Sequence, residues 1–147
     1  IIAGPVAWPD VRVLAADHQP HGGSPAAAYA PFGGLALQVE GLVAVTDATT
    51  ARVRISASET GRLSLDYTGL QPRNAAGRYA VSDGASQVTF HGCSQRPNGS
   101  RSSLFEGGFI VAGAQCARVD VYTGTSGRPI ERRIAFGVRG GACRPAA

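Results

Sequence analysis

Three side chains that can bind a metal ion lie close together in the N-terminal part of the chain. Asp17, His18 and His21 form the pattern D-H-x-x-H in a segment rich in glycine and proline. Two imidazoles and a carboxylate can hold a divalent copper, nickel or zinc ion. The pattern offers no fourth ligand, and ordering such a loop costs conformational entropy. We therefore favour solvated loop histidines and keep a metal or small-ligand carrier as the alternative.

A thiol and an imidazole form the second chemical candidate. His91 and Cys93 fall on one face of a strand predicted over 87–93. An imidazole beside a cysteine can generate a nucleophilic thiolate. The sequence supplies no third, orienting group and no G-x-S-x-G turn, and its carboxylates are scattered rather than paired. We therefore predict neither catalysis nor a cofactor, and an enzyme with an unrecognised site stays an alternative.

The three cysteines predict one disulfide and one free thiol. Cys93, Cys116 and Cys143 lack the C-x-x-C spacing typical of zinc sites, so an oxidising compartment is the better interpretation. Segments 118–122 and 133–136 resemble the two arms of a hairpin, which places Cys116 and Cys143 at the same end of it. We predict the pair Cys116–Cys143, with Cys93–Cys143 as the alternative.

The charge of the chain bears on its partners. All 14 basic residues are arginine, the formal net charge is +4 and the isoelectric point is near 9.4. Arg52 and Arg54 share a strand face, but no series of aromatic residues for base stacking accompanies them, so nucleic acid is not an expected partner. The expected partners are a protein or an anionic cell-envelope polymer. We nevertheless favour a solvated face whose arginines reflect codon bias over a face selected for binding such a partner.

Aromatic residues complete the predicted interaction surface. Trp8, Tyr29 and Phe32 are expected to form an exposed patch with Arg52 and Arg54. Tyr29 and Phe32 belong to the aperiodic segment 17–34, rich in glycine, proline and alanine. A loop of this length in a compact domain is either functional or disordered.

Apolar and polar residues alternate along most of the remaining chain. Successive side chains of a strand point to opposite faces, so this period of two predicts sheets with one buried and one solvated face. We expect a hairpin of 52–58 and 62–67, a strand covered on both sides at 109–111, a short strand at 11–14 and a polar loop over 94–106. The predicted fold is all-β: one antiparallel β-sandwich domain over 1–147, immunoglobulin-like or jelly-roll-like, with eight or nine strands and little helix.

Three stretches in the C-terminal part carry a family resemblance. They are TFHGC at 89–93, GGFIVAGAQC at 107–116 and IAFGVRGGAC at 134–143. Over roughly the last 60 residues, the chain resembles uncharacterised secreted or membrane-anchored proteins of high-GC Gram-positive bacteria. The resemblance implies an extracytoplasmic β-rich domain behind an N-terminal signal or single span, and it transfers no catalytic residues.

The expected location follows from these observations. The chain starts at Ile1 without methionine, so we expect that a signal peptide or membrane anchor precedes it. No stretch approaches the roughly 20 apolar residues of a membrane span. We expect a secreted protein, or one anchored to the outer face of the cell membrane, that is a non-catalytic binding or structural module. Its contacts would be made by one sheet face or by the loops 17–34 and 94–106.

Overall fold

The structure of the chain is a computed structural model. It describes residues 1–9, 29–30, 33–46, 49–93, 101–125, 127–138 and 142–143. The expected strand at 11–14 lies outside these residues.

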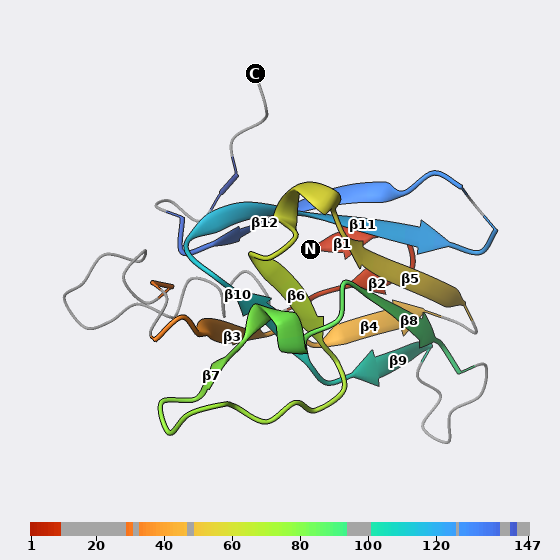
Figure 1. The fold of residues 1–147 in the computed structure, drawn as a ribbon. Helices are drawn as coiled ribbons and strands as arrows, with labels where there is room; N and C mark the ends of the chain where they lie inside the picture. The colour runs from red at the N-terminus through yellow and green to blue at the C-terminus, as the bar shows by residue number, and fades with distance from the viewer. Residues whose placement is uncertain are drawn as a thin grey trace.

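The described residues form twelve strands and two short 3-10 turns (Figure 1). The first six strands are β1 (Ile2–Ala3), β2 (Val6–Ala7), β3 (Ala36–Glu40), β4 (Val43–Thr46), β5 (Thr50–Ile55) and β6 (Leu63–Asp66). The other six are β7 (Arg78–Tyr79), β8 (Gln87–His91), β9 (Ser102–Phe105), β10 (Gly108–Val111), β11 (Gln115–Thr123) and β12 (Ile130–Phe136). The 3-10 turns are η1 (Ala57–Glu59) and η2 (Val81–Asp83).

All strand pairs are antiparallel, and they build three four-stranded sheets. The first sheet has the order β1-β2-β4-β9, the second β6-β10-β3-β7 and the third β12-β11-β5-β8. The all-β sandwich-like class is therefore confirmed. The strands outnumber the expected eight or nine because three of them are two-residue pairings, too short to leave an alternating pattern in the sequence.

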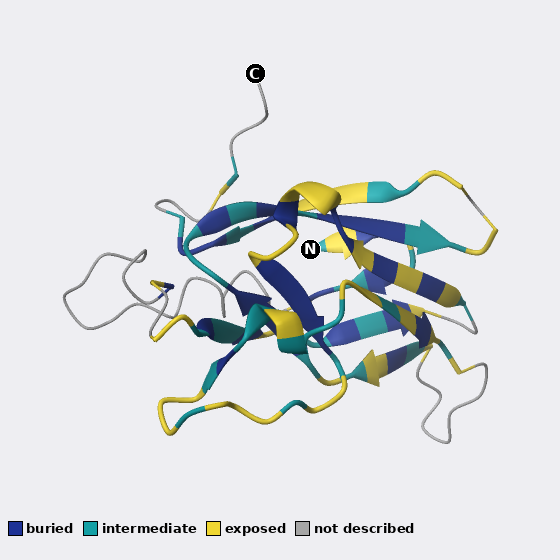
Figure 2. Cartoon of the chain, in the orientation of Figure 1, coloured by how far each residue is buried: buried dark blue, intermediate teal, exposed yellow. Residues whose placement is uncertain are grey.

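One apolar core joins the three sheets. Val45 comes from the first sheet, Phe109 from the second and Val53, Val119 and Phe136 from the third, and all five are fully buried. Figure 2 shows the resulting stripes along β5, where buried and exposed residues alternate. The period of two thus places the apolar side chains toward the core, as predicted from the sequence.

The second sheet is covered on both faces. All four residues of β10 are buried, which confirms the strand predicted at 109–111. Phe109 and Val111 face the main core, whereas Ile110 faces a smaller cluster with Ala36 and Tyr79 on the opposite side. Leu70 and the η2 residue Val81 pack against this smaller cluster and form the outer cover of the sheet.

The predicted hairpin of 52–58 with 62–67 is wrong. β5 pairs with β11 and β8, whereas β6 pairs with β10 in the second sheet. The chain crosses between the two sheets through η1, where the expected tight turn would lie (Figure 1). Alternation within a strand specifies its buried face but not its partner, so the pairing could not be obtained from it.

The predicted polar loop over 94–106 also needs correction. Residues 102–105 form β9, which pairs with β4 at the edge of the first sheet. In β9 the buried residue is Ser103 and the exposed one is Leu104, the reverse of the usual alternation, so the sequence pattern does not indicate a strand. Residues 94–100 lie outside the described part of the chain.

Candidate functional site

The outer face of the third sheet gathers charged side chains from neighbouring strands. Arg52 and Arg54 alternate on β5 with buried valine and isoleucine, so both arginines point away from the core. The register places Arg54 opposite Asp120 and Arg52 opposite Tyr122 on β11. Strand pairing therefore brings together side chains that are almost 70 positions apart in the sequence.

Two guanidinium groups lie against one aromatic ring on this face. The guanidinium carbon of Arg52 is 4.6 Å from the ring centre of Tyr122, and that of Arg54 is 5.3 Å away. Both distances fall within the range of a cation–π interaction. Arg52 has no carboxylate partner among the described residues, whereas Arg54 lies 3.9 Å from Asp120 with its side chain about half exposed. The ring thus fixes two cations whose charge stays accessible to solvent.

Asp120 is a buried carboxylate on the same face, 3.9 Å from the Arg54 guanidinium. Its exposure is 2%, and its Oδ2 accepts a hydrogen bond of 3.0 Å from the Ser56 hydroxyl. Arg118 Nε lies 3.5 Å from Asp120 Oδ1 and donates a hydrogen bond of 2.7 Å to the Ser56 oxygen. Asp120 therefore lies opposite Arg54 on the outer face of the sheet, yet its carboxylate is almost completely buried.

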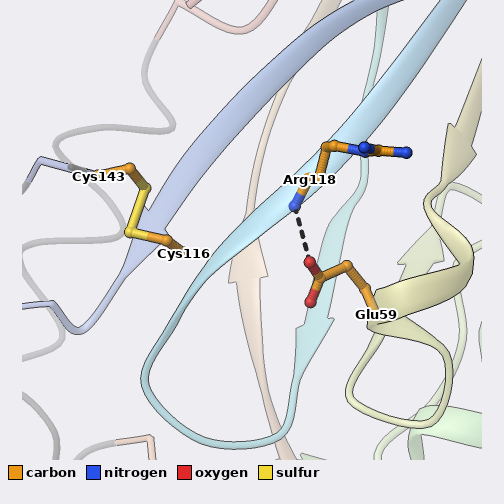
Figure 3. The surroundings of a disulfide bond; sticks show 4 residues. All are labelled: Glu59, Cys116, Arg118 and Cys143. Carbon is orange, nitrogen blue, oxygen red and sulfur yellow. Dashed lines mark hydrogen bonds between the residues drawn. A yellow bond between two sulfur atoms is a disulfide. The ribbon is translucent and has the colours of Figure 1, made fainter. Parts of the chain in front are cut away.

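Arg118 itself is held by its neighbours. Glu59 Oε1 accepts a hydrogen bond of 3.3 Å from the Arg118 backbone N–H, which fixes η1 to β11 (Figure 3). The Arg118 side chain points away from that contact and its Nη1 lies 3.6 Å from Glu131 Oε1. Arg118 is thus paired with Asp120 and Glu131, whereas Arg52 is exposed and has no carboxylate partner among the described residues.

A hollow adjoins Arg52 and Tyr122. Its volume is about 400 Å³, and its lining includes Arg52, Tyr122 and three threonines, Thr50, Thr89 and Thr125. Hydroxyl groups can donate and accept hydrogen bonds, and arginine donates in a planar fork suited to phosphate and carboxylate. The hollow thus offers a charged group and neutral polar groups within one site. The alternating sequence pattern indicated Arg52 and Arg54 as outward-facing residues. Tyr122 and the threonines join them only because strand pairing places their side chains beside Arg52.

The disulfide prediction is confirmed. Cys116, at the start of β11, is bonded to Cys143, and the two Cα atoms are 5.5 Å apart (Figure 3). The alternative pair Cys93–Cys143 is therefore wrong, and Cys93 is a free, exposed thiol.

His91 and Cys93, the predicted thiol–imidazole pair, have different hydrogen-bond partners. His91 Nδ1 lies 3.2 Å from the Thr50 hydroxyl, and the Cys93 backbone N–H donates a hydrogen bond of 2.7 Å to the Ser103 hydroxyl. Within the described residues, no hydrogen bond links His91 to Cys93.

The predicted metal ligands Asp17, His18 and His21 lie outside the described residues. The described residues contain no group of three or more histidine, cysteine, aspartate or glutamate side chains placed to hold a metal ion.

The prediction of Trp8 and Tyr29 as exposed contact residues is wrong, because both are fully buried. Trp8 packs on Phe109, with ring centres 6.3 Å apart, and its indole N–H donates a hydrogen bond of 3.1 Å to the Tyr67 hydroxyl. Burial raises the pKa of Tyr29 to about 12. A large aromatic side chain removes much apolar surface from water when it is buried, so burial in the core stabilises the protein more than exposure on the surface does. Phe32 lies outside the described residues.

No protein-family model, curated protein or solved structure matches the chain. None of the helical segments in the described part is long and apolar enough to cross a membrane.

Proposed function

We propose that this protein is a non-catalytic, extracytoplasmic binding module that holds an anionic polymer of the cell envelope on the outer face of its third sheet. The observation that carries the proposal is the arrangement of Arg52 and Arg54 around Tyr122, beside the threonine-lined hollow. The Cys116–Cys143 disulfide supports a location outside the reducing cytosol. The net charge of +4 favours encounter with a polyanion.

The chemistry of the face indicates how such a polymer would bind. Arg52 would form a bidentate contact with a phosphate or carboxylate group, because it has no competing carboxylate in the described residues. The threonines would hydrogen-bond the hydroxyl or ether oxygens of the backbone. Asp120, compensated from below by Ser56 and Arg118, would keep Arg54 oriented without removing its exposed charge.

Binding of soluble polyphosphate and of polyglutamate by the full chain, measured by calorimetry, tests the proposal. We expect saturable binding that weakens as salt is raised, and a loss of roughly fivefold or more in affinity for Arg52→Ala, since a charge-assisted hydrogen bond is removed. Arg62→Ala is the charge-matched control, because Arg62 is exposed and does not line the hollow. An equal loss of affinity in the two variants would show that binding depends only on the net charge of the protein, and the proposed binding face would then be wrong.

A further inference from the structure

A second hollow lies between the third sheet and the outer cover of the second. Its volume is about 530 Å³, within the range of roughly 300–1,000 Å³ that ligand pockets span. Ile55 reaches it from the end of β5, Leu63 from the start of β6, and Val81 from η2. Figure 1 shows η1 and η2 on either side of β6, where this lining is gathered.

The walls of the hollow are fixed by backbone and side-chain bonds. Ala85 and Leu65 exchange two backbone hydrogen bonds of 2.8 Å, and the Ile55 N–H donates one of 2.8 Å to the Ser86 carbonyl. Arg73 Nε donates a hydrogen bond of 2.6 Å to Asp83 Oδ2, which holds η2. A site with fixed walls loses little conformational freedom when a ligand enters.

The lining defines the chemistry of the occupant. It contains no charged side chain among the described residues. Its inner part combines the apolar Ile55 and Leu63 with the buried Ser64 hydroxyl, which has no hydrogen-bond partner among the described residues. The exposed Thr60, Ser82 and Ser86 supply hydroxyl groups at the rim. Burying an ionised group here would leave its charge uncompensated, which is costly. A neutral molecule with a largely apolar body and an oxygen atom at one end satisfies both parts of the lining.

We infer that this hollow is a binding site for a neutral, mainly apolar small molecule. The site is separate from the arginine face of the third sheet and uses no histidine. It would add a small-ligand function to the module whether or not the arginine face binds a polymer.

Nile red, a neutral apolar dye with carbonyl and ether oxygens, is a suitable probe for the full chain. We expect saturable binding of one dye per protein, with increased and blue-shifted fluorescence. Thr60→Trp at the rim and Ala80→Phe in the wall should each weaken binding about tenfold or more by occupying the space. Thr68→Trp is the matched control, because Thr68 is exposed and lies outside the hollow.

Three outcomes would overturn the inference. One is the absence of saturable dye binding by the unaltered protein. Another is unchanged binding in Thr60→Trp, the exposed variant that should fold even if Ala80→Phe does not. The third is loss of binding in Leu104→Ser, which would place the dye on the exposed apolar side chain of β9. Polyphosphate binding, measured in the same variants, reports the arginine face independently.

Discussion

At the scale of single residues, the outer face of the third sheet depends on the carboxylate of Asp120. This group lies on the face that points away from the core, yet neighbouring side chains bury it. Asp120 is 2% exposed, yet its partners are the half-exposed Arg54 and Arg118 and the buried hydroxyl of Ser56. Ser56 donates to Asp120 and accepts from Arg118, so a single hydroxyl bridges anion and cation. Asp120 Oδ1 accepts no hydrogen bond within the described part of the chain, so the Ser56 bond to Oδ2 and the nearby guanidinium groups compensate for the removal of this anion from water.

Ser56→Ala tests that bridge. The substitution leaves the Asp120 carboxylate and the Arg118 guanidinium each without a hydrogen bond, so we expect the free energy of unfolding to fall by about 1–3 kcal/mol. Urea unfolding measures it. Ser82→Ala, at an exposed position on η2, should change the stability by less than about 0.5 kcal/mol. A similar loss in both variants would show that the bridge contributes nothing.

The buried tyrosines predict a loss of stability at alkaline pH. Burial raises the pKa of Tyr29 to about 12, and it also raises the pKa of Tyr67. An unfolded tyrosine loses its proton near pH 10 while the folded one keeps it, so this contribution is intact below about pH 10 and is lost as the pH rises towards 12. Tyrosinate absorbance of the native protein at about pH 11 should therefore account for fewer than the four tyrosines, with the rest ionising on addition of urea. Ionisation of all four near pH 10 in the native protein would contradict this.

At the scale of elements, close strand pairing in the second sheet depends on a residue without a side chain. A Cβ atom at Gly108, the first residue of β10, would overlap the backbone carbonyl oxygen of Val39 on β3. Because β10 is the strand between β6 and β3, a shift there disturbs two ladders at once.

Gly108→Ala should accordingly lower the free energy of unfolding by more than about 3 kcal/mol, through displacement of backbone rather than of a flexible side chain. Thermal and urea unfolding followed by circular dichroism measure it. Gly127→Ala is the matched control, since nothing lies within 4 Å of the added carbon there. If the two variants unfold alike, the close approach of β10 and β3 is not a constraint.

At the scale of the whole molecule, three aromatic rings join the three sheets. Phe109 of the second sheet lies 6.3 Å from the ring of Trp8, which follows the first sheet, and 5.4 Å from that of Phe136 in the third. All three rings are fully buried.

Phe109→Ala should cost about 3–5 kcal/mol, because it opens a cavity where the sheets meet. The transition in urea is expected to stay a single step, since all three sheets lose the same contact. Leu104→Ala, at an exposed position, should stay within about 0.5 kcal/mol of the unaltered protein. A two-step transition with one sheet unaffected would show that the sheets do not share one core.

The sequence predicted the features that depend on local alternation or on neighbouring segments, and it missed the strand pairings between segments far apart in the chain. The buried β10, the hairpin of β11 with β12 and the Cys116–Cys143 bond followed from local pattern. The partner of β5 and the placing of Tyr122 between Arg52 and Arg54 are set by contacts far apart in the chain, which a local period does not encode. Trp8 was misplaced because a single aromatic residue beside a turn has no period that would indicate its face.

The position of Trp8 has a spectroscopic consequence. It is the only tryptophan of the chain, it is fully buried, and its indole N–H is bonded to the Tyr67 hydroxyl. When the protein is excited at the long-wavelength edge of its absorbance, where tyrosine does not absorb, the fluorescence therefore comes from the indole of Trp8 at the junction of the sheets. A shift of this emission to longer wavelength will report the entry of water into the junction, because no surface tryptophan contributes to the signal.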